Sequence, residues 1–233
     1  MINRLFSRKE PLFGVDDVLI DAPKGRRDGA TRQPAIPQSR VIAIVCILLA
    51  AATLFAYWQV QSFTFILFDD PLYVTENKIV RDGVTARGLA WAFSSFSAAN
   101  WHPLTWISHM VDVDLYRFNP AGHHWTSVVI HVINTILLFC VLQAMTRCVW
   151  PSAFVSALFG LHPLHVESVA WIAERKDVLS AFFWFAAMGA YLRYTKEPSL
   201  RRYGLVVALF VLGLLSKPMT MRKMLMSASF GTV

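Results

Sequence analysis

The sequence predicts an all-α, polytopic helical membrane protein, and two observations support this prediction. First, hydrophobic residues make up 55% of the 233 residues and charged residues only 16%, whereas a soluble domain carries about 25% charge. Second, residues 41–68, 118–146 and 148–166 contain no Asp, Glu, Lys or Arg. One soluble core cannot bury all three stretches. The composition therefore excludes a disordered chain, a secreted disulfide scaffold and a typical soluble enzyme.

Five apolar segments are candidates for membrane spans, since a helix of about 20 residues crosses the hydrocarbon core. We expect spans at residues 41–61, 124–145, 149–164, 178–194 and 203–216. The last two are short, so the charged side chains at their ends must reach the interface. His131 and Asn134 in the second span are costly in hydrocarbon and should face protein or water.

The basic residues set the orientation. Residues 1–40 are polar, contain four prolines and three glycines, and hold eight Lys or Arg, which indicates a flexible tail. If this tail is cytoplasmic, the inner segments hold 13 basic residues and the outer segments up to Lys217 hold 7. This bias favours a cytoplasmic N-terminus. It places residues 62–123 and 165–177 on the outer face, where we expect the chemistry.

The first outer segment opens on two adjacent carboxylates, Asp69 and Asp70, directly before Pro71. At a membrane surface such a pair can contain a general base with a raised pKa. The alternative is that an Asp before proline simply starts a helix or turn. Two short interfacial helices should follow, one over 85–93 and one beginning near 100–106.

Two histidines in the second of these helices, His102 and His109, are seven residues apart and share a helix face if the helix includes both. They are either packed beside tryptophans or ligands of a metal ion. We assign no metal ligands from the sequence, and a divalent metal cofactor is left open.

The second outer segment gathers most of the remaining candidate side chains. Arg175 and Lys176 could hold a phosphate at the membrane surface, and Glu167 and Glu174, seven residues apart, would lie on one helix face. The alternative is an interfacial helix whose charges mark the membrane boundary. The candidate substrate-binding residues are His102, His162, His165, Glu167, Glu174, Arg175 and Lys176.

Several enzyme classes have no support in the sequence. It contains no phosphate-cradling glycine loop and none of the patterns GxSxG, CxxC or HExxH. The three scattered cysteines form neither a disulfide framework nor a metal spacing. An outer-facing enzyme would therefore use a substrate delivered in or at the membrane, and we expect no nucleic-acid partner.

Five motifs together resemble one family, the transmembrane and tetratricopeptide-repeat O-mannosyltransferase-like proteins, mainly its bacterial members. The resemblance covers about residues 63–219 in order. The motifs are FDDPLYV at 68–74, NWHPLTWISHM at 100–110, NPAGHH at 119–124, HPLHVESVAWIAERKDVL at 162–179 and LLSKPM at 214–219.

The resemblance implies a GT-C-like glycosyltransferase fold with its active site on the outer face. Such enzymes take a sugar, here mannose or a similar one, from a polyprenyl-phosphate carrier and transfer it with inversion to a protein or peptide hydroxyl. An acidic pair in the first outer loop supplies the base. Here the pair is Asp69 and Asp70, and position in the pattern favours Asp69. The implied location is a cell membrane, the bacterial inner membrane, with multiple spans in the lipid bilayer.

The chain departs from the family pattern after Met219. The family continues with further spans and tetratricopeptide repeats, whereas residues 220–233 show neither. We therefore expect an incomplete transmembrane domain, 41–219, followed by a truncated or frameshifted tail. The alternatives are an inactive fragment, a non-catalytic membrane scaffold or assembly factor, and a transporter component. The transporter is favoured by His131 and Asn134 but opposed by the lack of broken, repeated spans.

Overall fold

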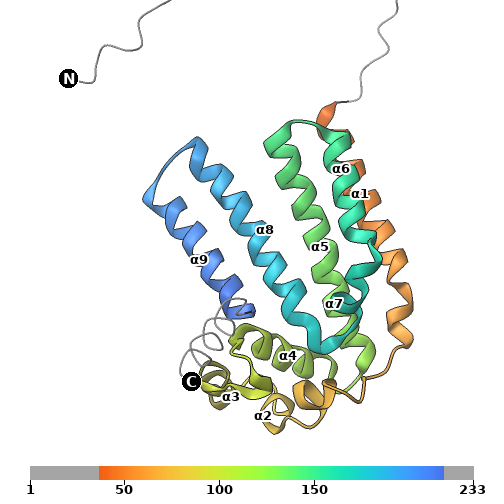
Figure 1. The fold of residues 1–233 in the computed structure, drawn as a ribbon, viewed down its shortest axis with the longest axis vertical. Coiled ribbons are helices and arrows are strands. Elements are labelled where there is room, and N and C mark those ends of the chain that lie inside the picture. Colours follow the sequence, from red (N-terminus) through yellow and green to blue (C-terminus); the bar gives the residue numbers. More distant parts are fainter. Residues whose placement is uncertain (1–36, 218–233) are drawn as a thin grey trace, which may run out of the picture. The chain divides into compact units, whose positions relative to one another are not determined.

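The computed structural model describes residues 37–217, and every regular element within this range is helical. The all-α prediction is thus confirmed for this part of the chain. Five long helices stand side by side in Figure 1. They are α1 (Gln38–Ala56), α5 (Pro120–Thr146), α6 (Val149–Leu161), α8 (Arg175–Lys196) and α9 (Leu200–Ser216).

A second set of helices, most of them short, lies across the lower ends of these five in Figure 1. Both segments that the sequence assigns to the outer face, 62–123 and 165–177, lie at this end, and we call this part of the fold the cap. Its elements are η1 (Trp58–Ser62), η2 (Pro71–Thr75), α2 (Lys78–Arg81), α3 (Ala86–Ser94), η3 (Ser97–Ala99), α4 (Pro103–Tyr116), η4 (Pro163–His165), α7 (Val166–Ala170) and η5 (Ile172–Glu174).

Side-chain hydrogen bonds to backbone amides determine where two of the helices begin, α3 in the cap and the long helix α5. The Thr85 hydroxyl accepts a hydrogen bond from the Gly88 amide at 2.9 Å and so caps α3. The Asn119 side chain likewise caps α5, which has Pro120 in its first turn. The two helices expected here are present as α3 and α4. Helix α4 begins one residue after His102, which lies outside it.

The long helices pack closely through small and polar residues. A Cβ added to Gly160 of α6 would meet Thr135 of α5 and Thr53 of α1 at 2.9 Å, so only glycine allows this approach. The side chain of His131 contacts the Gly160 carbonyl at 3.2 Å, and the Asn134 amide donates to the Val178 carbonyl at 2.8 Å. Both polar side chains therefore face protein, as the sequence predicts.

Length and composition identify two helical stretches that could cross a membrane within residues 37–217. They are Gln38–Ser62, with 25 residues, and Pro120–Thr146, with 27. Val149–Leu161 is apolar but shorter. The remaining two of the five expected spans form helices α8 and α9 at the predicted places. Neither α8 nor α9 is among the stretches that meet the length and composition of a membrane span, so the number of spans stays a proposal.

The chain divides into two units, Met1–Ile36 and Pro37–Val233. Helix α1 begins at Gln38, slightly before the expected boundary of the transmembrane domain at residue 41. Most of the predicted tail 1–40 and all of the predicted tail 220–233 lie outside the described residues.

Candidate functional site

The two adjacent carboxylates have different surroundings. Asp70 is fully buried, and its two oxygens accept hydrogen bonds from the Ile66 amide at 2.8 Å and the Ala173 amide at 3.0 Å. It thus ties the first outer segment to the second across 103 residues. Asp69 is half-buried, and its carboxylate accepts no hydrogen bond from any residue between Pro37 and Lys217. Of the two, Asp69 is therefore the carboxylate free to meet a substrate.

The environment of Asp70 is that of a structural group. Burial raises the pKa of Asp70 above its ordinary value, although the two backbone amides oppose this shift. The residue precedes Pro71 at the start of the helical turn η2, as the turn-starting alternative expects, but its side chain makes no capping bond to that turn. Its carboxylate bonds instead hold residues 67–70, which we call the acidic turn, against η5.

An aromatic stack lies beside the acidic turn. The Tyr73 ring stacks on His102, with centroids 5.7 Å apart, and on Trp106, at 4.8 Å. The Lys176 ammonium lies 5.4 Å from the centre of the Tyr73 ring and forms an ion pair with Glu174 at 2.7 Å. Burial, and then the charge of Lys176, lower the pKa of His102 to about 4, so this imidazole is neutral at physiological pH. The stack thus combines one cation with a neutral donor and acceptor.

Arg175 occupies a different position from the one its place in the sequence suggests. Its guanidinium is fully buried and donates to the Ser127 hydroxyl at 3.0 Å, to the His123 carbonyl at 2.5 Å and to the Asp112 carboxylate. Every side-chain nitrogen is thus bonded to protein. Three of the five N–H groups are used in this way. Because the guanidinium is fully buried, it is not exposed to a phosphate at the surface, and Lys176 is the cation that lies beside Tyr73 and the acidic turn.

The two glutamates of the second outer segment do not share a helix face. Trp171 has an extended backbone, with φ −90° and ψ 120°, and it separates α7 from η5. The break presents the Ala173 amide to Asp70. Glu167 lines a hollow of about 520 Å³ together with the extended segment 62–66 and Trp171. Glu174 pairs with Lys176 on the other side of the break.

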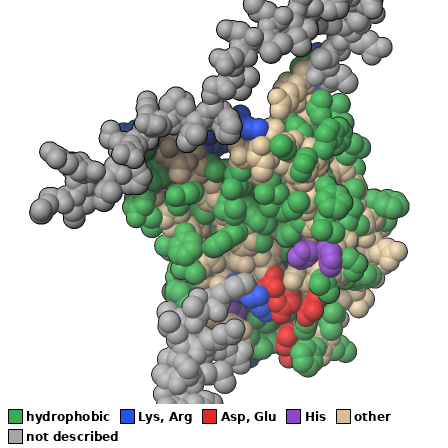
Figure 2. Space-filling view, turned by 45° about the horizontal axis from the view of Figure 1, so that its top comes forward, with side chains coloured by type: hydrophobic (Ala, Val, Ile, Leu, Met, Phe, Trp, Pro, Cys, Tyr) green, Lys and Arg blue, Asp and Glu red, His purple; other side chains and the backbone are tan. Residues whose placement is uncertain are grey.

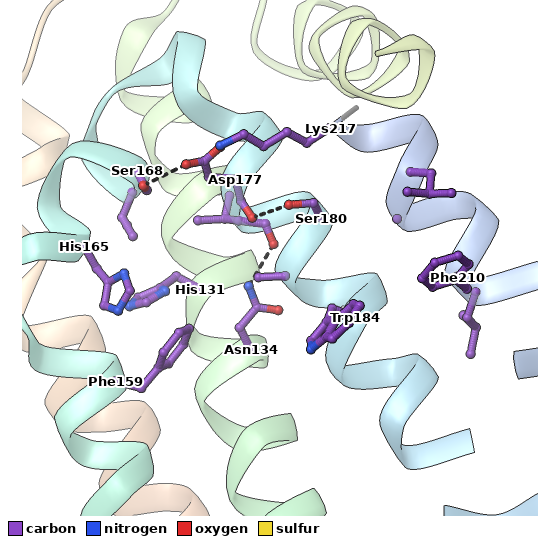
Figure 3. Close-up of a pocket in the computed structure, with 16 residues that line it drawn as sticks. His131, Asn134, Phe159, His165, Ser168, Asp177, Ser180, Trp184, Phe210 and Lys217 are labelled. Carbon is purple, nitrogen blue, oxygen red and sulfur yellow. Dashed lines mark hydrogen bonds and ion pairs between the residues drawn. The ribbon is translucent and has the colours of Figure 1, made fainter. Parts of the chain in front are cut away.

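The larger hollow is a cavity of about 660 Å³ between α5, α6, α8 and α9. Its walls are mainly apolar. The end nearest the cap carries polar side chains, as Figure 3 shows. The lining residues labelled there are His131, Asn134, Phe159, His165, Ser168, Asp177, Ser180, Trp184, Phe210 and Lys217.

An ion pair lies at the end of this cavity that is nearest the cap. The Lys217 ammonium, which follows α9, binds the Asp177 carboxylate of α8, and the Ser168 hydroxyl donates to the same carboxylate at 3.2 Å. His165 lies nearby, and burial followed by the charge of His162 lowers its pKa, which keeps its ring neutral. A space-filling view of the molecule shows histidine, acidic and basic side chains gathered together next to a broad hydrophobic surface (Figure 2).

The structure brings the candidates together in two groups. The side chains of Lys176 and Asp177 diverge from the first turn of α8, one toward Tyr73 and the acidic turn, the other into the cavity. The first turn of α8 therefore links the two groups. The sequence interpretation missed Lys217 and Asp177 as site residues and treated them as span ends. The signal that could have indicated Lys217 is a lone cation directly after an apolar helix of 17 residues.

Comparison with known proteins finds relatives that are named protein O-mannosyl-transferases. The chain is 30% identical over 181 residues to protein O-mannosyl-transferase TMTC1 of Mus musculus, a match that covers 73% of this chain and 19% of the relative. It is 29% identical over 120 residues to Tmtc1 of Drosophila melanogaster, covering 52% and 14%. It is 24% identical over 155 residues to TMTC3 of Homo sapiens, covering 63% and 16%.

The homologues of this chain are thus proteins named O-mannosyl-transferases, in agreement with the motifs at 68–74 and 162–179. The chain spans about a fifth, or less, of the length of these curated relatives. No family model and no solved structure matches it.

Proposed function

We propose that this chain is the membrane part of a glycosyltransferase of GT-C type. It transfers mannose or a similar sugar from a polyprenyl-phosphate carrier to a protein hydroxyl on the outer face of the membrane. The observation that carries the proposal is the difference between the two adjacent carboxylates. The fully buried Asp70 carboxylate holds residues 62–123 to residues 165–177 through its hydrogen bonds, whereas the half-buried Asp69 carboxylate has no hydrogen-bond partner within residues 37–217. The names of the homologues support the type of reaction.

In the proposed reaction Asp69 acts as the general base. Its carboxylate takes the proton of the acceptor hydroxyl while the hydroxyl oxygen attacks the anomeric carbon of the sugar. The bond between that carbon and the phosphate oxygen breaks, and its electron pair leaves with the polyprenyl phosphate. Attack from the face opposite the phosphate inverts the anomeric configuration. Asp70 acts as a positioning residue because its buried carboxylate fixes the turn that presents Asp69.

The cavity between α5, α6, α8 and α9 has the chemistry that the carrier requires. An isoprenoid chain would lie against the apolar walls, which include Trp184 and Phe210. The single negative charge of a sugar phosphodiester would meet Lys217 and the neutral His165 at the outer end. The hollow beside Glu167 and the extended segment 62–66 is the place we propose for the acceptor peptide.

The proposal includes five membrane spans with a cytoplasmic N-terminus, in a bacterial inner membrane. It is supported by the 13 to 7 distribution of basic residues and by the position of both outer segments at one end of the helices (Figure 1). Reporter fusions test the topology: a fusion after Phe96 should be active outside, and one after Lys196 inside. The opposite pattern would move the acidic turn to the wrong side of the membrane and exclude the proposal.

A transfer assay tests the function itself. The chain in membranes, or a longer active parent that carries residues 41–219, is incubated with a serine- and threonine-containing peptide and with mannose labelled on either polyprenyl phosphate or a nucleotide. We expect label on a peptide hydroxyl from the lipid donor only. The Asp69→Asn variant should lose the activity and Asp82→Asn, an exposed acidic residue of the same outer segment, should keep it. Transfer from the nucleotide sugar in lipid-free detergent would exclude the proposed donor.

A further inference from the structure

Three side chains of the metal-ligating types meet where α4 packs against α5. His109 and Asp112 lie three residues apart on one face of α4, and His123 faces them from the first turn of α5. One nitrogen or oxygen atom of each lies within 4.8 Å of the others. All three residues are buried, with at most 1% of their surface exposed. The group is separate from the acidic turn and from the cavity between α5, α6, α8 and α9.

The ring nitrogens of this group indicate a missing positive partner. The Nε2 atom of His123 lies 2.8 Å from the Arg117 carbonyl oxygen, which can only accept, so Nε2 carries the hydrogen. The lone pair of Nδ1 then points to a carboxylate oxygen of Asp112 at 3.5 Å, which is also an acceptor. In the part of the chain that the structure describes, both ring nitrogens of His109 are buried without a hydrogen-bond partner. Buried polar groups in native proteins are almost always paired.

We propose that His109, Asp112 and His123 bind one divalent transition-metal ion, with Zn²⁺ as the best match. Imidazole nitrogen and carboxylate oxygen form a common ligand set for Zn²⁺, whereas Mg²⁺ and Ca²⁺ prefer oxygen ligands throughout. Metal–ligand bonds of about 2.1 Å place tetrahedral ligand atoms about 3.4 Å apart. From their 4.8 Å limit the three atoms need to converge by up to about 1.4 Å, which rotation of the side chains can provide.

The surroundings of the three ligands are arranged as they are around metal sites. The hydrogen bond from His123 to the Arg117 carbonyl fixes the ring so that Nδ1 faces the site, as outer-shell partners of ligating histidines do. The Thr126 hydroxyl donates to the second oxygen of Asp112 at 2.9 Å. Arg175 also binds the Asp112 carboxylate. The guanidinium donates to Oδ2, the same oxygen that faces His123 Nδ1, so a metal ion would share this oxygen with Arg175 and would take its other ligands from the two imidazoles.

The ion would join α4 to α5 and thereby fix the cap on the long helices. Helix α4 is also held to another long helix, because its Thr105 hydroxyl donates to the Ser216 carbonyl of α9 at 2.9 Å. Three protein ligands leave the fourth tetrahedral position to a water molecule, and the role that we propose for the ion is to join the two helices. It is independent of the proposed sugar transfer, since none of the three ligands belongs to the acidic turn.

Metal content tests the proposal on the purified, untagged chain in detergent. The chain is treated with a chelator, equilibrated with Zn²⁺ or Co²⁺ in the presence of excess Mg²⁺, and freed of unbound ions. We expect about one Zn²⁺ per wild-type chain, and visible absorption bands of tetrahedral Co²⁺. His109→Gln should retain less than about a tenth of the metal. His102→Asn, at an equally buried histidine next to α4, should retain all of it. Thr126→Val should weaken binding by about 10–100-fold.

Folding of each variant is followed by circular dichroism and gel filtration. If His109→Gln does not fold, the Co²⁺ spectrum and stoichiometry of the wild-type chain decide the question alone. A folded wild-type chain that binds no Zn²⁺ or Co²⁺ above background would overturn the proposal. So would a folded His109→Gln variant that binds as much as the wild type, or full displacement of the metal by Mg²⁺. None of these results bears on whether Asp69 acts in sugar transfer.

Discussion

Replacement of each carboxylate of the acidic pair by its amide should separate catalysis from stability. Asp69→Asn removes a half-buried carboxylate that has no hydrogen-bond partner within residues 37–217. A substitution at such a site changes the free energy of unfolding by about 0.5 kcal/mol or less. Loss of a general base should lower the rate of sugar transfer by about 10²–10⁴-fold. This variant should therefore be folded and nearly inactive.

Asp70→Asn should have a different effect because both oxygens of Asp70 accept buried backbone amides, at 2.8 and 3.0 Å. The amide side chain can accept only one of these hydrogen bonds, and its NH₂ group faces the other donor. One buried N–H is left without a partner, which costs about 1–3 kcal/mol. Asp70→Ala removes both acceptors and should cost roughly twice as much.

The two variants are compared by thermal unfolding in detergent and by initial rates of transfer in the active parent. For a chain of this size, about 1 kcal/mol lowers the midpoint of unfolding by roughly 2–4 °C. We expect a lower midpoint for Asp70→Asn and Asp70→Ala, and an unchanged midpoint for Asp69→Asn. If Asp69→Asn transferred sugar at the wild-type rate, or if it unfolded as early as Asp70→Ala, the assignment of roles within the pair would be refuted.

Three further substitutions test other parts of the site. Lys217→Gln should raise the KM for a polyprenyl-phosphate sugar by about 10–100-fold, because a charge-assisted hydrogen bond contributes about 1.5–3 kcal/mol. Lys196 lies at the end of α8 far from Asp177 and Lys217, so Lys196→Gln should leave that KM unchanged. Arg175→Met leaves the buried Asp112 carboxylate without its cation and should lower the free energy of unfolding by about 3–5 kcal/mol. The exposed ion pair of Arg202 with Glu197 should contribute less than about 1 kcal/mol. An equal loss of stability in Arg202→Met would contradict this reasoning. The pKa of His102 is lowered from 6.5 in the unfolded chain to about 4 in the folded chain. Between these two pH values the unfolded chain binds a proton at His102 and the folded chain does not, so the free energy of unfolding should fall as the pH is lowered from 6.5 to 4. His102→Phe should make that fall shallower, and an unchanged slope would show that His102 does not contribute.

The sequence predicted local features well and long-range ones poorly. The apolar runs located the five long helices, and the patterns around Leu89 and Pro103 located the cap helices α3 and α4. These features depend on neighbouring residues. The hydrogen bond between Asp70 and the Ala173 amide joins residues 103 positions apart, and no pattern in the sequence indicates such a pairing.

Arg175 and Glu174 show the same limit at the site. Adjacent charges at the start of an apolar helix indicate a membrane boundary. The guanidinium of Arg175 is nevertheless buried, because it donates a hydrogen bond to the carboxylate of Asp112, 63 residues earlier. The expected shared face of Glu167 and Glu174 was wrong because the chain breaks at Trp171 to reach Asp70. The cavity was not predictable, since four separate helices form its walls.

Photo-crosslinking of the donor tests the central claim most directly, that the cavity between α5, α6, α8 and α9 holds a polyprenyl phosphate. A polyprenyl-phosphate analogue with a diazirine in its isoprenoid chain is activated on the chain in membranes, and the modified residues are identified by mass spectrometry. We predict labels on the cavity faces of α8 and α9, around Trp184 and Phe210, which unlabelled polyprenyl phosphate removes and a plain C55 alcohol does not. Labels confined to exposed apolar residues of α1, such as Ile47 and Leu48, or labels that no competitor removes, would contradict the account.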